Sequence, residues 1–190
     1  MALGQNLFES IQRSTKTAGA PSLKTCVFLS HQKEDKKEAA AVAKALLANG
    51  VDIYFDEDDE VLALARIRGD DAAMVKCIEI GLDNCTHLLG IITPRSKTSW
   101  WIPYEIGGAT GRGRDCAHLI DKRASNLPSY IKVATLVADK EDLMNWVRPI
   151  QRPSSRFLSG LLKEAMAMES LNAYLPEHRS EADIGFIDHS

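Results

Sequence analysis

The sequence predicts an α/β fold in which a parallel β-sheet carries helices on both faces. Short apolar runs of the kind that buried strands need alternate along the chain with longer segments of helical periodicity. Such alternation is typical of a parallel sheet. The chain has 190 residues, of which 45% are hydrophobic and 26% are charged, and this is enough to bury a sizeable core. We therefore expect one compact domain with appendages.

The first half of the predicted domain contains two strands and two helices. A strand is expected over residues 26–30, which read Cys-Val-Phe-Leu-Ser, and an Ala-rich helix over 34–49 that Gly50 closes. The second strand is expected over 51–55, and a helix with an apolar face over 70–82.

The second half continues the same alternation, and Pro94 stops its first strand. Strands are expected over 87–92, 117–120 and 131–137, with a helix that carries Trp101 and Glu105 after the first of them and a short helix over 141–147 at the end.

Two flanks lie outside this pattern. Residues 1–23 contain a short amphipathic segment followed by a polar linker, and residues 154–175 have apolar residues at helical spacing. We expect the latter helix to dock on the core. The predicted organisation is thus an N-terminal extension (1–23), the α/β domain (24–150), and a C-terminal helix with a polar tail (151–190).

Composition excludes several classes of function. A net charge of −3 disfavours a nucleic-acid surface. No apolar run is long enough to cross a bilayer, and the N-terminus lacks a signal-peptide pattern, so we expect a cytoplasmic protein without membrane contact. The four cysteines are widely spaced and the five histidines are scattered, which predicts reduced thiols and no metal site.

The segment over 96–105 is the most informative motif, because it brings a tryptophan and a carboxylate together. Trp101 and Glu105 are four residues apart, so a helix places them on one face, whereas Trp100 is rotated by about a hundred degrees and is expected to pack elsewhere. A carboxylate beside an indole is partly desolvated, which suits it to stabilising a positively charged transition state next to a flat aromatic substrate. The alternative is a capped helix with core tryptophans and a solvated Glu105.

Three segments resemble the characteristic boxes of a TIR (Toll/interleukin-1 receptor) domain. They are Val27-Phe-Leu-Ser-His31 with Asp35 after it, Val51 to Asp56, and Thr93 to Gly107. The boxes occur in the right order over residues 24–150. The resemblance implies a flavodoxin-like arrangement with five parallel strands.

The resemblance also implies a function. Some TIR domains only bind other TIR domains, whereas others cleave the bond between nicotinamide and ribose in NAD and release ADP-ribose or a cyclic isomer. The enzymatic members carry a Glu preceded four residues earlier by Trp, which implies that Glu105 is catalytic. Breaking this bond builds oxocarbenium character on the ribose, and one carboxylate suffices because nicotinamide is already a cationic leaving group. NAD would be the substrate, and we expect no cofactor and no metal.

Further substrate-binding residues follow from the resemblance. Ser30 and His31 are expected near the nicotinamide and ribose, Lys33 near the pyrophosphate, and Trp101 at the wall of the pocket. Asp56 opens an acidic run over 56–60 and is the member nearest the strand. Three of these interpretations have a simpler alternative. His31 could be a structural histidine, Lys33 a solvated lysine, and the acidic run a solvated face.

Two other segments carry interpretations. The glycine-rich stretch over 106–114 follows a helix instead of a strand, so it fails the dinucleotide fingerprint and is interpreted as a flexible helix exit. The segment over 56–70 is interpreted as a long loop with apolar residues in its middle that mediates self-association, and the alternative is a short helix packed on its own core.

The leading hypothesis is an NAD glycohydrolase or ADP-ribosyl cyclase of the stand-alone bacterial type. It resembles the Thoeris-like TIR proteins of anti-phage defence, which either deplete NAD or make a cyclic ADP-ribose signal for a separate effector. The alternatives are a non-enzymatic TIR–TIR interaction module, or a nucleoside-bond hydrolase or transferase acting on another nucleotide.

Overall fold

A five-stranded parallel sheet forms the centre of the protein. The structure is a computed structural model and describes residues 25–55, 60–151, 169–175, 184 and 186–187. The sheet has the order β2-β1-β3-β4-β6, and every neighbouring pair is parallel. This is the flavodoxin-like order, so the predicted fold class is confirmed. The sheet strands are β1 (Cys26–Ser30), β2 (Asp52–Tyr54), β3 (His87–Ile92), β4 (Asp115–Ile120) and β6 (Thr135–Val137).

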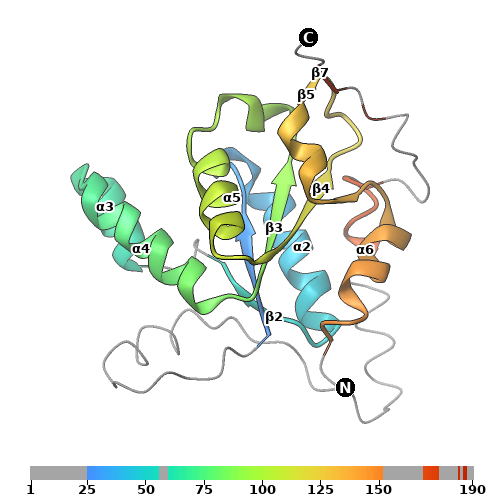
Figure 1. Ribbon diagram of the computed structural model, residues 1–190, viewed down its shortest axis with the longest axis horizontal. Helices are drawn as coiled ribbons and strands as arrows, with labels where there is room; N and C mark the ends of the chain where they lie inside the picture. The colour runs from blue at the N-terminus through green and yellow to red at the C-terminus, as the bar shows by residue number, and fades with distance from the viewer. Residues whose placement is uncertain (1–24, 56–59, 152–168, 176–183, 185, 188–190) are drawn as a thin grey trace.

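Helices cover both faces of the sheet (Figure 1). On one face lie α2 (Lys36–Ala48) and α6 (Lys140–Val147), and on the other lie α4 (Asp71–Asn84) and α5 (Trp101–Gly111). Among the described residues, no helix has the length and apolar character needed to cross a membrane. The remaining short elements are α3 (Glu60–Arg68), the 3-10 helices η1 (Lys33–Asp35), η3 (Pro94–Thr98) and η4 (Ser129–Val133), and the strand pair β5 (Leu127–Pro128) and β7 (Phe186–Ile187).

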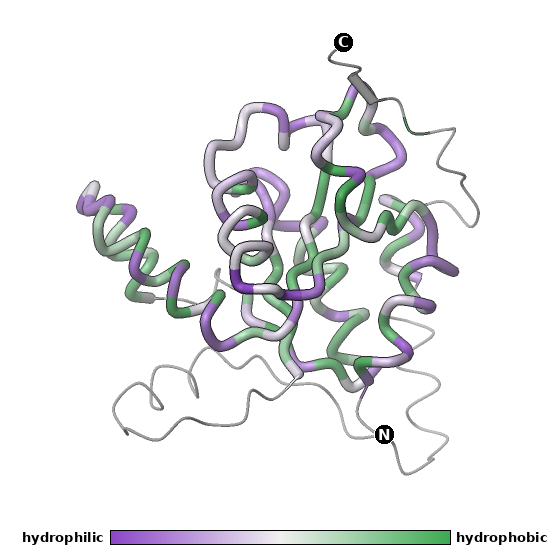
Figure 2. Tube along the Cα trace, viewed as in Figure 1, coloured by the Kyte–Doolittle hydropathy of each residue, from purple (hydrophilic) through white to green (hydrophobic). Residues whose placement is uncertain are grey.

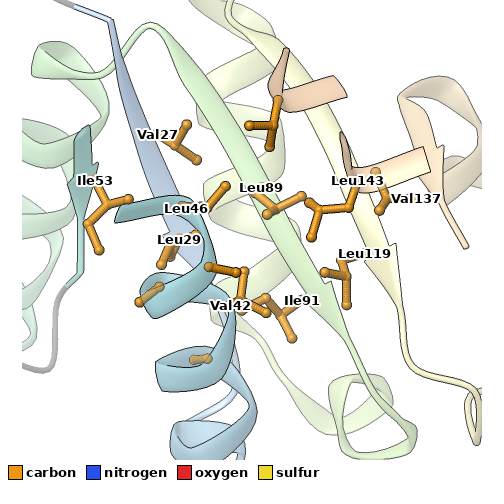
Figure 3. Packing of buried hydrophobic residues seen from close by; sticks show 14 of the residues in the cluster. Val27, Leu29, Val42, Leu46, Ile53, Leu89, Ile91, Leu119, Val137 and Leu143 are labelled. Carbon is orange, nitrogen blue, oxygen red and sulfur yellow. The ribbon is translucent and has the colours of Figure 1, made fainter. Parts of the chain in front are cut away.

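Alternation along each strand divides the core into two clusters. In β1, Val27 and Leu29 face α2, whereas Cys26 and Phe28 face the α4 and α5 side. Figure 3 shows the first cluster, in which Leu46 of α2 packs among strand residues. Because a parallel sheet is buried on both faces, its strands are apolar at nearly every position, which is the pattern the sequence displays.

The described part of the C-terminal extension packs on the first cluster. Leu171 and Leu175 are fully buried there, and the Tyr174 carbonyl accepts a hydrogen bond from the Lys122 amide at 3.1 Å. Most of the helix expected over 154–175 lies outside the described residues, as does the N-terminal extension over 1–23.

The strand expected over 131–137 is wrong in its first part. Residues Ser129–Val133 form η4, and only Thr135–Val137 pairs with β4. The backbone carbonyl of Ile131 accepts a hydrogen bond from Nδ1 of His118 at 2.8 Å, and the Ile131 side chain is buried. This carbonyl is therefore bonded to a side chain of β4 instead of to a sheet ladder.

The glycine-rich segment is helical, which corrects its interpretation as a flexible exit. Helix α5 continues to Gly111 and ends at Arg112. At Gly108 a side chain would bring its Cβ within 2.9 Å of Cδ1 of Leu82 on α4. The glycine therefore permits close approach of the two helices.

The segment over 56–70 also differs from its interpretation as a loop. Residues Glu60–Arg68 form α3, which packs against α4, and α3 with the first part of α4 extends away from the sheet (Figure 1). Leu62 and Ala65 are buried, whereas Val61, Leu64 and Ile67 remain exposed. Figure 2 shows this mixture of hydrophobic and hydrophilic residues along α3.

His118 is a fully buried titratable group on the α5 face of the sheet. It pairs in register with Gly90, where a side chain would place its Cβ 3.0 Å from Cδ2 of the imidazole. Burial lowers the pKa of His118, and the hydrogen bond to the Ile131 carbonyl opposes this only in part. The imidazole is therefore neutral in the folded protein, with its proton on Nδ1, since a carbonyl can only accept.

Acid is expected to destabilise the fold partly through His118. The pKa of the folded state is depressed, so the unfolded chain binds a proton near pH 6.5 that the folded chain does not. The contribution of neutral His118 to the free energy of unfolding is full above pH 6.5. It falls as the pH falls below that value, by at most about 1.4 kcal/mol per pH unit. Urea unfolding of the wild-type protein and of His118→Asn between pH 7 and pH 5 should show a shallower pH dependence in the variant. Equal slopes would contradict this assignment.

Candidate active site

A cavity of about 230 Å³ lies at the carboxyl edge of the sheet. Its lining includes residues of the segment after β1 and residues from the start of α5, which follows β3. Strand order reverses between β1 and β3, and ligands in open α/β sheets bind at this switch point. The lining residues are His31, Gln32, Lys33, Leu62, Arg66, Met74, Ile78, Trp101 and Glu105.

Glu105 is a nearly buried carboxylate, with 6% of its surface exposed. The hydroxyl of Ser30 donates a hydrogen bond to its Oε2 at 2.5 Å. Ser30 is the last residue of β1 and is itself buried, so the rigid sheet fixes the orientation of the carboxylate. A short bond from a hydroxyl to an ionised acceptor is a strong one. The arrangement presents one oriented negative charge to a small cavity.

Trp101 lies one helical turn before Glu105 and lines the same cavity, as the spacing predicts. Its indole is 37% exposed and meets the ring of Tyr104 edge to face, with the ring centres 6.0 Å apart. The Tyr104 hydroxyl in turn donates to Glu79 on α4 at 2.5 Å. These contacts hold the indole as a wall beside the carboxylate.

Trp100 does not pack into the core, so the expectation that it packs elsewhere in the protein is wrong. Its side chain is 90% exposed. The physical reason is its position: α5 begins at Trp101, and Trp100 is the cap residue before the first turn, where no second layer of structure covers it.

Two of the other predicted residues line the cavity. The imidazole of His31 lies 5.3 Å from the ring of Phe55, centre to centre, and the exposed Lys33 follows two residues later. Ser30 reaches the site through Glu105 and is not among the lining residues. Asp56 lies outside the described residues.

Helices α3 and α4 supply lining residues that the sequence did not indicate. Leu62 and Arg66 come from α3, and Met74 and Ile78 come from α4. Leu62 and Arg66 are four residues apart, a spacing that has meaning only if the segment is interpreted as a helix. Arg66 adds a second cation to Lys33 at the cavity.

A buried carboxylate ties the loop after β1 to the loop after β3. Asp35 is fully buried and accepts hydrogen bonds from the Thr93 hydroxyl at 2.5 Å and from Nε of Arg95 at 2.6 Å. The Arg95 guanidinium also contacts Glu38 at 3.2 Å. The two chain segments that border the cavity are therefore fixed relative to each other.

Fold and cavity together define a class: a flavodoxin-like α/β domain with a small cavity at its switch point and one oriented, buried carboxylate in that cavity. The family model for the TIR domain matches residues 27–141, which is more than half of the sequence. The chain belongs to the TIR domain family.

Two known proteins are similar to this chain, one in sequence and one in fold. The chain is 31% identical over 100 residues to the 2' cyclic ADP-D-ribose synthase BtTIR of Bacteroides thetaiotaomicron, and the match covers 52% of this chain and 32% of that protein. The chain thus spans about a third of that relative's length. The fold is similar to the TIR domain of the Toll-related receptor TRR-2 from Hydra magnipapillata, with a TM-score of 0.52 and 13% identity over 65% of this chain and 96% of that one.

Proposed function

We propose that this protein cleaves the bond between nicotinamide and ribose in NAD, with Glu105 as the catalytic residue. The observation that carries the proposal is the buried Glu105 carboxylate, held by Ser30 and bordered by Trp101 in the cavity at the carboxyl edge of the sheet. The similarity to a 2' cyclic ADP-D-ribose synthase supports the same chemistry.

Four of the lining residues have a role in this mechanism. Nicotinamide lies against Trp101 and leaves as a neutral molecule, while positive charge develops on the ribose ring. The Glu105 carboxylate stabilises that charge, and its burial strengthens the interaction. Lys33 and Arg66 are cations that contact the pyrophosphate.

The ribosyl group is then captured by an oxygen nucleophile. Water would give ADP-ribose, whereas a hydroxyl of the same substrate molecule would give a cyclic isomer, and the relative named as a cyclic ADP-ribose synthase favours the second outcome. In this proposal the product is a signal for a separate effector protein in bacterial anti-phage defence, and the reaction takes place in the cytoplasm.

A second candidate function is an interaction module without catalysis. The exposed apolar residues Val61, Leu64 and Ile67 on α3 favour it, since such residues commonly mark contact surfaces. The two candidates are compatible if the enzyme works as an assembly.

One experiment tests the proposal directly. Purified protein is incubated with NAD, and free nicotinamide, ADP-ribose and cyclic ADP-ribose isomers are separated by chromatography. Release of nicotinamide supports catalysis, and the second product decides between hydrolysis and cyclisation. A protein that self-associates but releases no nicotinamide at any concentration tested would instead be an interaction module.

Ser30→Ala is expected to slow nicotinamide release roughly tenfold, because the lost hydrogen bond to a charged acceptor is worth about 1.5 kcal/mol. The carboxylate stays in place but loses one of the contacts that orient it, so the loss should appear in kcat more than in KM. Steady-state kinetics with NAD, alongside thermal melting, measure both. A fall in kcat no larger than the loss of folded protein explains would remove Ser30 from the mechanism.

A further inference from the structure

The cavity is too small for the whole of the proposed substrate. It measures about 230 Å³, whereas pockets that enclose drug-sized ligands measure roughly 300–1,000 Å³. NAD joins two nucleotides and is larger than such a ligand. If the nicotinamide and its ribose occupy the space beside Glu105, the adenosine half must lie outside the cavity. This inference therefore rests on the proposed function.

The surface next to the cavity carries an unusually exposed aromatic residue. Trp100 is 90% exposed and directly precedes Trp101, which lines the cavity. Its side chain makes no capping hydrogen bond to α5. An indole is a large apolar group that is usually highly buried, so its exposure calls for a partner outside the described fold.

The charges at the cavity indicate where the substrate leaves it. Lys33 and Arg66 line the cavity and offer cations to the two phosphates that join the halves of NAD. The adenosine half then lies outside the cavity, and Trp100 is the exposed aromatic residue next in sequence to the cavity residue Trp101. An adenine ring is flat and stacks on an indole face without needing specific hydrogen bonds.

We propose that Trp100 is a stacking platform for the adenine ring of the substrate. It is a specificity-determining residue that recognises the half of NAD that takes no part in bond cleavage. Base stacking on an aromatic side chain changes affinity by roughly five- to a hundredfold on alanine substitution. Because Trp100 supports neither the core nor the helix cap, its loss should leave folding unchanged.

Two substrates of different length test the platform. Kinetics are measured for the wild-type protein, Trp100→Ala and Trp100→Phe with NAD and with nicotinamide mononucleotide, which has the reacting bond but no adenosine. Trp100→Ala should raise KM for NAD about five- to a hundredfold with little change in kcat, and Trp100→Phe should recover most of the affinity. The KM for nicotinamide mononucleotide should be unchanged. Tyr130→Ala serves as a matched control, since Tyr130 is an exposed aromatic residue on η4 that does not line this cavity.

Each other result has a distinct meaning. An equal rise in KM for both substrates, or no rise with NAD, overturns the inference while leaving the proposed function intact. A change in the concentration dependence of activity without a change in KM also overturns it, and assigns Trp100 to a contact between copies of the chain. No nicotinamide release by the wild-type protein contradicts the proposed function.

Binding measurements cover the case in which the short substrate is not turned over. Calorimetry with the Glu105→Gln protein compares ADP-ribose with ribose 5-phosphate. Adding the substitution Trp100→Ala should weaken the binding of ADP-ribose and leave the binding of ribose 5-phosphate unchanged. Unchanged binding of ADP-ribose overturns the inference.

Discussion

A Glu105→Gln variant is expected to fold normally and to release nicotinamide from NAD at least about a hundredfold more slowly than the wild-type protein. Glutamine has the same shape, and its amide oxygen can still accept the Ser30 hydrogen bond, so the packing of α5 is preserved. What disappears is the negative charge, and with it the stabilisation of the oxocarbenium-like ribose. Initial rates over a range of NAD concentrations, with circular dichroism as a check on folding, measure the effect.

Asp83→Asn is the matched control for this substitution. Asp83 is a carboxylate on α4 that accepts a hydrogen bond at 2.7 Å from Nε of Arg112, the residue that caps the end of α5, so it contacts the same helix without lining the cavity. Its loss should cost some stability and change the rate only a few-fold, because no charge near the ribose is removed. Comparable losses in the two variants, or full activity of Glu105→Gln, would contradict the catalytic role of Glu105.

The sheet could be predicted because each strand is specified by its own few residues. The runs over 26–30 and 87–92 are each apolar at every position but one, as burial on both faces favours, and they form β1 and β3. The segment over 131–137 is apolar at five of its seven positions, yet its first part forms η4. The deciding interaction is the bond from His118 to the Ile131 carbonyl, which joins two elements and is invisible to local patterning.

In the candidate site, too, the local features could be predicted and the contacts between distant residues could not. The spacing of Trp101 and Glu105 on one helical face is local, and both residues line the cavity. The bond between Ser30 and Glu105 joins residues 75 positions apart and depends on how α5 lies over β1. Arg66 was missed because α3 was interpreted as a loop.

Trp100 shows a different limit of sequence reasoning. A tryptophan in an apolar segment is expected to be buried, because burying its large ring is favourable. Whether a partner surface exists depends on where the helix begins. Helix α5 begins at Trp101, so Trp100 is the cap residue that precedes the helix. Its side chain is exposed instead of packed on the sheet.

If the proposed activity is present, the protein is expected to work as an assembly whose contact surface includes the exposed face of α3. Buried Leu62 and Ala65 attach α3 to the protein, while Val61, Leu64 and Ile67 remain accessible, with Ile67 81% exposed. The same helix contributes Leu62 and Arg66 to the cavity. A second subunit that covers the apolar face would stabilise α3 in place and complete the wall of the site, which makes activity depend on protein concentration.

Specific activity should therefore fall by at least about tenfold across roughly a thousandfold dilution of the wild-type protein. Ile67→Glu places a charge on the apolar face at its most exposed residue and should weaken association about thirtyfold or more, as loss of an important interface residue does. Its activity at high dilution should drop accordingly, while its melting temperature stays unchanged because the side chain is exposed.

Two variants control for effects other than loss of the apolar surface, namely the change of side chain at position 67 and the change in net charge. Ile67→Leu keeps the surface apolar and should retain the wild-type dilution curve. Lys44→Gln makes the same change of one charge unit at an exposed position on α2, away from the cavity, and should also have no effect. Sedimentation in the presence of NAD gives the mass of the active species. A monomeric mass together with constant activity per molecule would rule out the assembly, because a monomer whose site is complete has no reason to respond to dilution.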